Sequence, residues 1–414
     1  MPTDFPPPVY NLLRGVRVLD ASRVLAGPYC GQLLADLGAE VIKIERPGLG
    51  DETRQWGPPF RPSGESAYYL SCNRNKRGVA LDMSSPRGRE LLHSLVRVSD
   101  IVLENYRADS AEKLGLSPAQ LHAVNPRVIV CSISGFGRTG PFADLPGYDF
   151  AIQAMSGLMS ITGPRDGPPS KVGVAVTDVL TGLYAATAVL SCLVARARSG
   201  HGYAIDLALL DCAVAAQVNV VQAYLTRLEN GLSPEEALPG LQGNAHLQIV
   251  PYQLFATRDG WLVLAVGNDA QWARFARAAV PDLAGDERFL TNPNRVRHRE
   301  ALVPLLEAIL RAKSTREWVA LLESIGVPHA PRWDNADLFA HPHASERGCR
   351  VTVRDPQGRP VEFVGSPFHI EGDEPGRSAT YPPGIGEHTA DVLRELCGLG
   401  ADELDGLREE GVIG

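Results

Sequence analysis

The first 132 residues alternate between strand-like and helix-like patterns, and this alternation limits the folds open to the chain more than any other feature. Residues 15–20 (GVRVLD) form a short apolar run typical of a buried strand, residues 27–37 have helical periodicity, and residues 40–45 form a second apolar run. The same order continues with strands at 78–81, 101–104 and 127–132 and with helices at 85–98 and 118–124. Strands that alternate with helices favour an α/β fold, in which a doubly wound parallel sheet is covered by helices.

A change of pattern near residue 228 predicts a second, smaller domain. Residues 228–240 (LENGLSPEEALPG) are rich in turn-forming and charged residues, which indicates a boundary. Before it we expect a long helix at 178–198, a strand at 204–209 and a helix at 210–228; beyond it, a hairpin at 252–266, helices at 270–280, 299–310 and 315–325, a hairpin around 355–358 and a helix at 388–396. We therefore predict a large domain that begins with residues 1–228, a smaller α+β domain at 229–330 and a C-terminal return to the large domain at 331–414.

The charge balance limits the partners of the chain. The formal net charge is −8, so the protein has no overall field that attracts nucleic acid or an anionic membrane surface. A polyanionic ligand would have to be bound by a local cluster of cations. We expect neither nucleic acid nor a membrane as a partner.

Cysteine usage and the apolar runs bear on the compartment. The seven cysteines are widely spaced and contain no C-x-x-C pair, which favours a reduced, cytoplasmic location. Residues 1–8 (MPTDFPPP) lack the basic start and apolar core of a signal peptide. We also expect no uncharged run near the ~20 residues that a membrane span needs.

Asp178 is the carboxylate that the sequence singles out. It lies between an apolar stretch and a long apolar helix, in the segment 173–182 (GVAVTDVLTG). A carboxylate at this place is most often an N-terminal helix cap. The alternative is a nucleophile that the helix field keeps ionised, with small neighbours such as Gly182 leaving space for a bulky substrate.

A glycine-rich loop follows the strand at 127–132. Residues 135–140 (GFGRTG) match the dinucleotide-binding pattern G-x-G-x-x-G, which would indicate a dehydrogenase. Pro141 and Pro146, however, would break the helix that this pattern must open. The sequence favours an ordinary loop here, with the lining of a ligand site as an alternative.

Basic residues follow several predicted strands of the first half. They are Arg46, Arg54, Arg74, Lys76, Arg77 and Arg107. An open parallel sheet binds ligands beyond the carboxyl ends of its strands, and guanidinium groups suit phosphate or carboxylate. A solvated surface is the alternative. The residues Ala26, Gly27 and Pro28 at a helix start would add backbone N–H donors. His341 and His343 have no third ligand at a useful spacing, so we predict no metal site.

An ordered set of motifs resembles the class III coenzyme A transferases along nearly the whole chain. It comprises residues 15–54, 73–83 (NRNKRGVALDM), 100–107 (DIVLENYR), 132–141 (SISGFGRTGP), 147–150 (GYDF), 174–186 (VAVTDVLTGLYAA) and 385–389 (IGEHT). Within the family, the segments 56–60, 68–71, 157–163 and 249–253 are most similar to the branch that transfers CoA from succinyl-CoA to glutarate and related dicarboxylates.

The resemblance implies a nucleophile and a set of binding residues. Asp178 would form an aspartyl-CoA thioester, so neither metal nor a tightly bound cofactor is needed besides the CoA substrate. CoA would lie along Leu25, Ala26, Arg46, Leu81, Met83, Asn105, Tyr106, Arg107, Lys113, Ser134 and Gly135. The formyl-CoA enzyme of the family has Gln, Arg and Lys at the positions of Leu25, Lys113 and Ser134. Candidates for the acid substrate are Arg54, Trp56, Arg74 and His246, with Arg74 preferred. Two ring-like subunits would interlock as a homodimer.

The resemblance also leaves room for related functions. The same fold hosts 2-methylacyl-CoA racemases, whose proton-transfer base is a His in a Gly-His-Asp triplet; here the triplet has Tyr148 at that position. Tyrosine, with an ordinary pKa near 10, is a poor base at neutral pH. A transferase of this family acting on oxalate, malate, citramalate or carnitine-type acids stays open, and so does a non-catalytic acyl-CoA-binding protein.

Overall fold

The computed structural model describes residues 8–372 and 377–414. The contacts divide the chain into two compact units, and each is described by itself. Of the described residues, the larger comprises 8–158, 172–218, 342–372 and 377–414, and the smaller comprises 159–171 and 219–341. The N-terminal segment that lacks the pattern of a signal peptide lies almost wholly outside the described residues.

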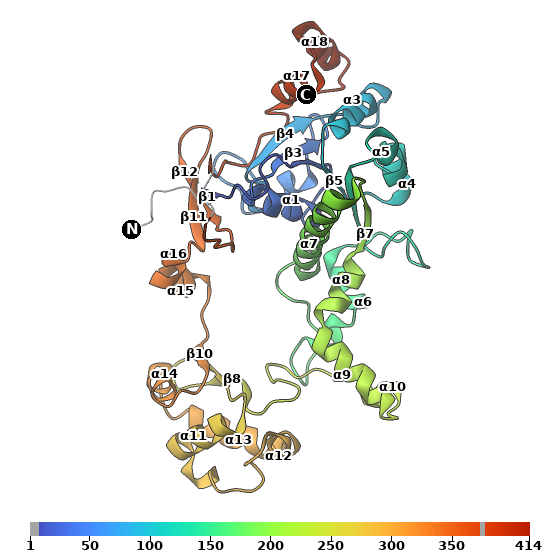
Figure 1. The fold of residues 1–414 in the computed structure, drawn as a ribbon. Helices are drawn as coiled ribbons and strands as arrows, with labels where there is room; N and C mark the ends of the chain where they lie inside the picture. Colours follow the sequence, from blue (N-terminus) through green and yellow to red (C-terminus); the bar gives the residue numbers. More distant parts are fainter. Residues whose placement is uncertain (1–7, 373–376) are drawn as a thin grey trace. The chain divides into compact units, whose positions relative to one another are not determined.

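The larger unit is built on a six-stranded sheet in which all pairs are parallel, as the alternating pattern predicts (Figure 1). Its strands are β2 (Arg17–Asp20), β3 (Glu40–Glu45), β4 (Lys76–Ala80), β5 (Ile101–Glu104), β6 (Ile129–Ser134) and β7 (Ala204–Ala208). Their spatial order is β4-β3-β2-β5-β6-β7. The chain therefore reverses its direction of progress between β2 and β5, and such a switch point is where an open parallel sheet binds its ligand.

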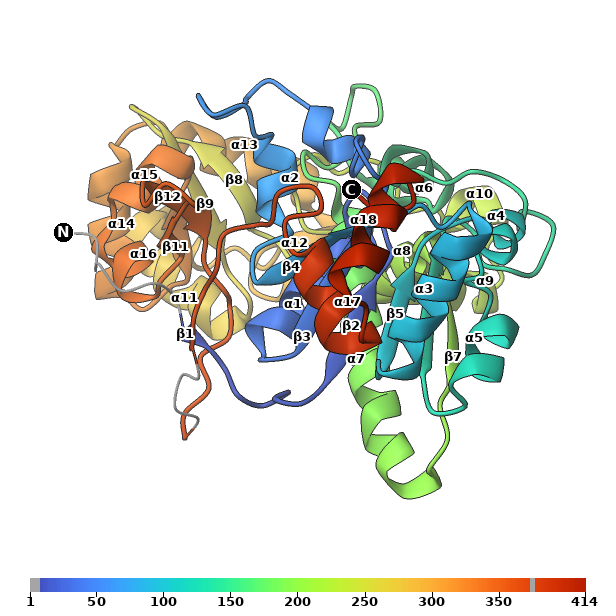
Figure 2. The same ribbon diagram turned by 90° about the horizontal axis from the view of Figure 1, so that it is seen from above.

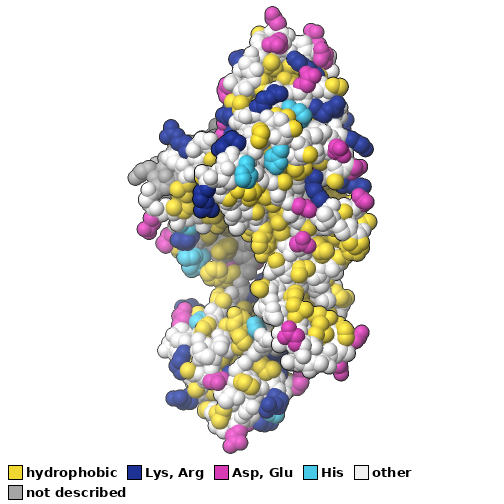
Figure 3. All heavy atoms as spheres, turned by 45° about the vertical axis from the view of Figure 1, so that its right-hand side comes forward, with side chains coloured by type: hydrophobic (Ala, Val, Ile, Leu, Met, Phe, Trp, Pro, Cys, Tyr) yellow, Lys and Arg dark blue, Asp and Glu magenta, His cyan; other side chains and the backbone are white. Residues whose placement is uncertain are grey.

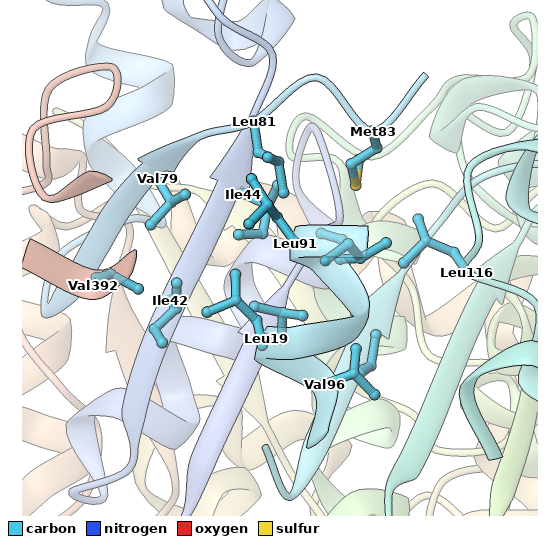
Figure 4. Packing of buried hydrophobic residues seen from close by; sticks show 14 of the residues in the cluster. Leu19, Ile42, Ile44, Val79, Leu81, Met83, Leu91, Val96, Leu116 and Val392 are labelled. Carbon is cyan, nitrogen blue, oxygen red and sulfur yellow. The ribbon is translucent and has the colours of Figure 1, made fainter. Parts of the chain in front are cut away.

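Helices cover both faces of this sheet because both faces of each central strand are apolar. Leu19, Ile42 and Val102 point to one core, which is closed by α3 (Pro86–Arg97), α17 (Thr389–Cys397) and α18 (Ala401–Glu409) (Figure 4). Figure 2 shows α17 and α18 on the same side of the sheet as α3. The C-terminal helices thus complete the core that the first hundred residues begin.

The second core lies on the opposite face. Val18, Ile101 and Ile133 pack there against α1 (Ala26–Asp36), α7 (Val176–Ser199) and α8 (Leu209–Ala216). The single helix predicted at 210–228 is broken at Gln217 into α8 and α9 (Val218–Glu229). The Gln217 side chain donates to the carbonyl oxygens of Ala213 and Ser156, which fixes the end of α8.

Among the described residues, α7 is the one helix that is long and apolar enough to cross a bilayer, by length and composition. The bent pair of α8 and α9 meets the same criterion only if the two helices are counted as one span. This differs from the expectation that no such run exists, because residues 179–195 of α7 carry no charge. Leu183, Tyr184 and Val194 of α7 are exposed, as are Val214 and Val218. Hydrophobic side chains gather on the face drawn in Figure 3, toward which α7 and α8 are turned.

The smaller unit has its own sheet and core. Strands β8 (Tyr252–Ala256), β9 (Trp261–Ala265) and β10 (His329–Pro331) form an antiparallel sheet in the order β10-β9-β8. Its core gathers Phe255, Leu264, Trp272, Leu306 and Trp318, and its principal helices are α11 (Asp269–Ala279), α13 (Arg299–Leu310) and α14 (Thr315–Ser324). The remaining tail forms the hairpin of β11 (Arg350–Arg354) and β12 (Pro360–Val364) in the larger unit.

Candidate active site

Asp178 lies in the first turn of α7 but does not cap it. The N-cap residue is Ala175, which has no side chain able to accept a hydrogen bond. The cap is supplied from another element: the Asp149 carboxylate accepts from the backbone N–H of Thr177 at 2.8 Å and from its hydroxyl at 2.7 Å. Asp149 begins helix α6 (Asp149–Met155). Because Asp149 caps this helix, the Asp178 carboxylate has no capping role.

The electrostatic setting of Asp178 differs from the expected one. Burial and, next, the neighbouring Asp149 carboxylate raise the pKa of Asp178 to about 7. No hydrogen bond to the Asp178 carboxylate exists within the described parts of the chain, so no hydrogen bond offsets these two effects. The prediction that the helix field keeps this group ionised at neutral pH is therefore wrong, because burial and Asp149 outweigh that field. Asp178 exchanges its proton near neutrality instead.

Gly182 also has another role than the predicted one. A Cβ at this position would lie 2.8 Å from the carbonyl oxygen of Ala26 and 3.0 Å from Cδ1 of Tyr29. The absence of a side chain therefore lets α7 pack closely on α1, and the space is filled by protein rather than left for a substrate. This packing brings the start of α1 next to the first turns of α7.

Asp178 lines a pocket of about 250 Å³ at the switch point of the sheet. We call it the Asp178 pocket. Its walls are the turn after β2, the segment after β5 and the loop after β6. It brings together the predicted residues Leu25, Ala26, Trp56, Asn105, Tyr106, Arg107, Ser134, Gly135 and Asp178. Tyr148, the residue in the racemase position, lies in the same wall.

A larger cavity of about 770 Å³ adjoins this pocket. It holds the predicted residues Arg46, Leu81 and Met83 and is lined further by Leu49 and Leu114. The two cavities share Arg23, Glu52, Trp56 and Tyr106. Lys113 lines neither of them; its side chain is 78% exposed and its ammonium is 4.0 Å from Asp109.

The turn after β2 is held in a strained conformation. Val24 has a φ of 70°, which is unfavourable for a β-branched residue. Its N–H donates to the Asp51 carboxylate at 3.2 Å. The Asn105 amide clamps the preceding residue, accepting from the Arg23 N–H at 2.8 Å and donating to the Arg23 carbonyl at 2.7 Å. Asn105 thus joins the ends of β2 and β5 across the switch point.

Buried charges support this turn from below. The Lys76 ammonium donates to Asp20 at 2.8 Å, to the Pro28 carbonyl at 2.7 Å and to Asn73 at 2.9 Å. The Lys43 ammonium donates to the Ser22 carbonyl at 2.8 Å and pairs with Asp51 at 3.2 Å. Although burial opposes it, the two ammonium groups lower the pKa of Asp20. Lys76, one of the basic residues noted in the sequence, is therefore a structural group.

Arg54 and Arg74 lie outside both cavities. Arg54 donates to Glu45 at 2.7 and 2.6 Å and to the Pro383 carbonyl at 2.9 Å. Arg74 is buried and donates to Asp36 and, at 2.7 Å, to the Val364 carbonyl. The structure does not bring these two arginines together with Asp178. Their guanidinium groups stabilise the larger unit instead.

His246 belongs to the smaller unit. Its ring centroid lies 5.3 Å from that of Tyr252, and its carbonyl accepts from Arg299 at 2.6 Å. Desolvation and, next, Arg299 lower the pKa of His246. No group of three or more possible metal ligands is found among the residues that the structure describes.

The glycine-rich loop lines the Asp178 pocket, and its ends meet. A Cβ on Gly135 would lie 2.5 Å from Cα of Gly147, so both positions require glycine. Arg138, inside this loop, is a pocket residue that the sequence reasoning missed, as is Arg23. The signal that could have found them is the one used for Arg46: each follows the carboxyl end of a parallel strand.

Comparisons with known proteins point to one family. The family model described as CoA-transferase family III matches residues 13–389. The chain is 42% identical to a succinate–glutarate CoA-transferase of Agrobacterium fabrum over 402 residues, which cover 96% of this chain and 97% of that protein. It is 38% identical to the succinyl-CoA:glutarate CoA-transferase of Homo sapiens, covering 97% of this chain and 90% of the relative.

Solved structures of similar proteins support the same family. A CAIB/BAIF family protein from Brucella suis is 42% identical and superimposes with a TM-score of 0.80, over 94% of this chain and 100% of that one. Rv3272 from Mycobacterium tuberculosis is 29% identical, with a TM-score of 0.79, over 92% of this chain and 99% of that one. The chain therefore belongs to CoA-transferase family III and is a CoA-transferase.

Proposed function

We propose that the enzyme moves CoA from succinyl-CoA to a dicarboxylic acid such as glutarate, with Asp178 as the nucleophile. The observation that carries this proposal is the Asp178 pocket. It holds a carboxylate that does not cap its helix, at the switch point of the sheet, and it lies beside a cavity lined by Arg46, Leu81 and Met83. The names of the relatives at 38–42% identity support the substrates. Other relatives at 33–36% identity are named for citramalate, oxalate and mesaconate, so these acids are the alternative acceptors.

The proposed reaction has two symmetrical halves. A carboxylate oxygen of Asp178 attacks the thioester carbonyl of the donor; the C–S bond breaks, giving a mixed anhydride and CoA thiolate. The thiolate then attacks the Asp178 carbonyl of the anhydride, forming an aspartyl-CoA thioester and releasing the donor acid as its carboxylate. The acceptor carboxylate repeats these steps in reverse order. The thioester bond is conserved, so no external energy source is needed.

In this proposal the two cavities divide the donor between them. The nucleotide end of CoA takes the larger cavity, with Arg46 as a cation for its phosphates. The pantetheine arm passes the shared residues Trp56 and Tyr106. The thioester carbonyl then reaches Asp178. Backbone N–H groups at the start of α1, around Ala26, are candidates to stabilise the oxyanion.

The assembly and the location are also proposals. We infer a homodimer, because α7, α8 and the first residue of α9 leave Leu183, Tyr184, Val194, Val214 and Val218 exposed, and a patch of this kind marks an interaction surface. We infer a cytoplasmic location, since all seven cysteines are free thiols in a chain of this size.

The direct test is capture of the covalent intermediate. The protein is incubated with succinyl-CoA and its intact mass is measured. We expect a mass increase of one CoA minus water, absent from Asp178→Ala and Asp178→Asn. Asp211→Asn is the matched control, because Asp211 also lies in the first turn of a helix but outside both cavities. An Asp178→Ala variant that still transfers CoA would exclude Asp178 as the nucleophile.

A further inference from the structure

Three arginines line the Asp178 pocket, and they differ in how much of their binding capacity is already used. Arg107 is 54% exposed and lies 3.6 Å from Asp109. Arg23 is 40% exposed, pairs with Glu52, stacks on the Tyr106 ring and also lines the larger cavity. Arg138 is 19% exposed and lines the Asp178 pocket but not the larger cavity. Arg138 is thus the least exposed of the three and is confined to the pocket in which the proposed chemistry occurs.

The position of Arg138 is fixed from three sides. Its backbone N–H donates to Asp206 at 3.0 Å, at the level of β7. The preceding N–H, of Gly137, donates to the Ser134 hydroxyl at 3.0 Å. One terminal nitrogen of the guanidinium pairs with the fully buried carboxylate of Glu104 at the end of β5. A side chain held in this way is arranged before a ligand arrives.

The guanidinium of Arg138 is not saturated by this pairing. Its Nε is buried and has no hydrogen-bond partner within the described residues, and the same is true of the Nε of Arg23. A buried polar group without a partner is uncommon in a folded protein. The second terminal nitrogen of the guanidinium makes no hydrogen bond to a described residue and is not among the buried atoms, so a carboxylate entering from the pocket would supply its acceptor.

The place of Arg138 argues for the acyl group rather than for the phosphates of CoA. In the proposed arrangement Asp178 must touch the thioester carbonyl, and the phosphates lie at the far end of CoA, in the larger cavity with Arg46. An anion that shares the 250 Å³ pocket with Asp178 is therefore the one attached to the acyl chain. For a dicarboxylic acid, this anion is the second carboxylate.

We propose that Arg138 binds the distal carboxylate of the acyl group and thereby selects dicarboxylic over monocarboxylic acids. This inference rests on the proposed function and names the specificity residue of the same site. Glu104 and Asp206 are positioning residues for Arg138. A monocarboxylic acid of similar length would leave the guanidinium without its partner, and such a loss discriminates strongly between substrates.

The test compares two acids in the full-length enzyme, with glutarate and butyrate as acceptors and succinyl-CoA and butyryl-CoA as donors. Arg138→Gln is expected to lower kcat/KM for glutarate by roughly 10- to 100-fold and for butyrate by less than about 3-fold. Arg138→Lys, which keeps the charge but not the fork, is expected to fall between. Arg196→Gln is the matched control: Arg196 is 12% exposed, pairs with Asp100 at 2.7 Å and lines neither cavity.

The outcomes separate this inference from the proposed function. An equal loss with both acids, or no loss with either, would overturn the role of Arg138. If Arg138→Gln does not fold, the glutarate-to-butyrate ratio of Arg138→Lys decides, and an unchanged ratio counts against the inference. Wild-type enzyme that forms no CoA adduct with any donor would instead refute the proposed nucleophilic mechanism.

Discussion

The carboxylate of Asp149 accepts two hydrogen bonds from Thr177, one from its backbone N–H at 2.8 Å and one from its hydroxyl at 2.7 Å. Thr177 immediately precedes Asp178, so Asp149 fixes the first turn of α7 and places a second carboxylate close to the first. Burial and, next, the Asp149 carboxylate raise the pKa of Asp178, because two like charges in a partly buried site repel each other.

Replacing this neighbour should change the acidity of Asp178. In Asp149→Asn the amide oxygen can still accept from Thr177, but the negative charge is gone. We therefore expect the pKa of Asp178 to fall from about 7. The acid limb of the pH dependence of CoA-adduct formation should move to lower pH, measured by rapid quench and intact mass. An unmoved limb would show that Asp149 does not control this ionisation.

Removing the cap altogether should have a different effect. Asp149→Ala loses both hydrogen bonds to Thr177, and loss of an N-terminal cap costs about 1–2 kcal/mol. We expect the free energy of unfolding in urea to fall by this amount, whereas Asp149→Asn should lose less. Equal stability of the two variants would contradict the capping role.

The raised pKa of Asp178 predicts a stability that falls as pH rises. The folded form holds the proton up to about pH 7, whereas the unfolded form loses it near pH 4, so between these values the folded state binds more protons. Asp178→Asn should remove this dependence and raise the free energy of unfolding at pH 8 by roughly 1–3 kcal/mol, a figure reduced for partial solvation. Urea titrations at pH 5 and pH 8 test this, and a variant no more stable than wild type at pH 8 would contradict it.

The Asn105 clamp should affect binding more than stability. Asn105→Asp keeps the acceptor for the Arg23 N–H but loses the donor to the Arg23 carbonyl, so the turn that carries Leu25 and Ala26 should loosen. We expect CoA affinity, measured by calorimetry, to fall roughly 10-fold, with a loss of about 1–2 kcal/mol in the free energy of unfolding. Unchanged affinity would mean that the turn does not need the clamp.

The buried pair of Lys76 and Asp20 should be intolerant of single changes. Lys76→Met leaves the Asp20 carboxylate buried without its partner, and such a loss typically costs about 3–5 kcal/mol. The double variant Lys76→Met with Asp20→Asn removes both charges and should recover part of the loss. Chemical unfolding of the three proteins checks this, and a double variant less stable than Lys76→Met alone would contradict it.

The elements of the larger unit could be predicted because they depend on local patterns. The strands around Leu19, Ile42 and Val102 are apolar on both faces, and the helices between them are amphipathic. The break at Gln217 could not, because it depends on a hydrogen bond to Ser156, 61 residues earlier. The apolar sequence around it reads as one continuous helix.

The site residues that lie at the carboxyl ends of strands could be predicted from the sequence. The residues whose role depends on ion pairs between distant segments could not. Asn105, Ser134 and Leu25 lie at the carboxyl ends of parallel strands, and the structure gathers them with Asp178. Arg54 and Arg74 are also basic residues near predicted strands, but their guanidinium groups form ion pairs with Glu45 and Asp36. Which guanidinium is engaged and which is left for a ligand depends on contacts between segments that sequence spacing does not show.

The meeting of Gly135 with Gly147 has a consequence for how enzymes of this shape can diverge. Because the two ends of the loop touch, the residues between them form a closed excursion whose length and content can vary without moving the sheet beneath. Mutations between the two glycines can therefore change which acid is bound, while the glycines and Asp178 stay fixed. Selection can act on substrate choice and on the reaction separately, so an enzyme of this fold can acquire a new substrate without first losing its catalytic activity.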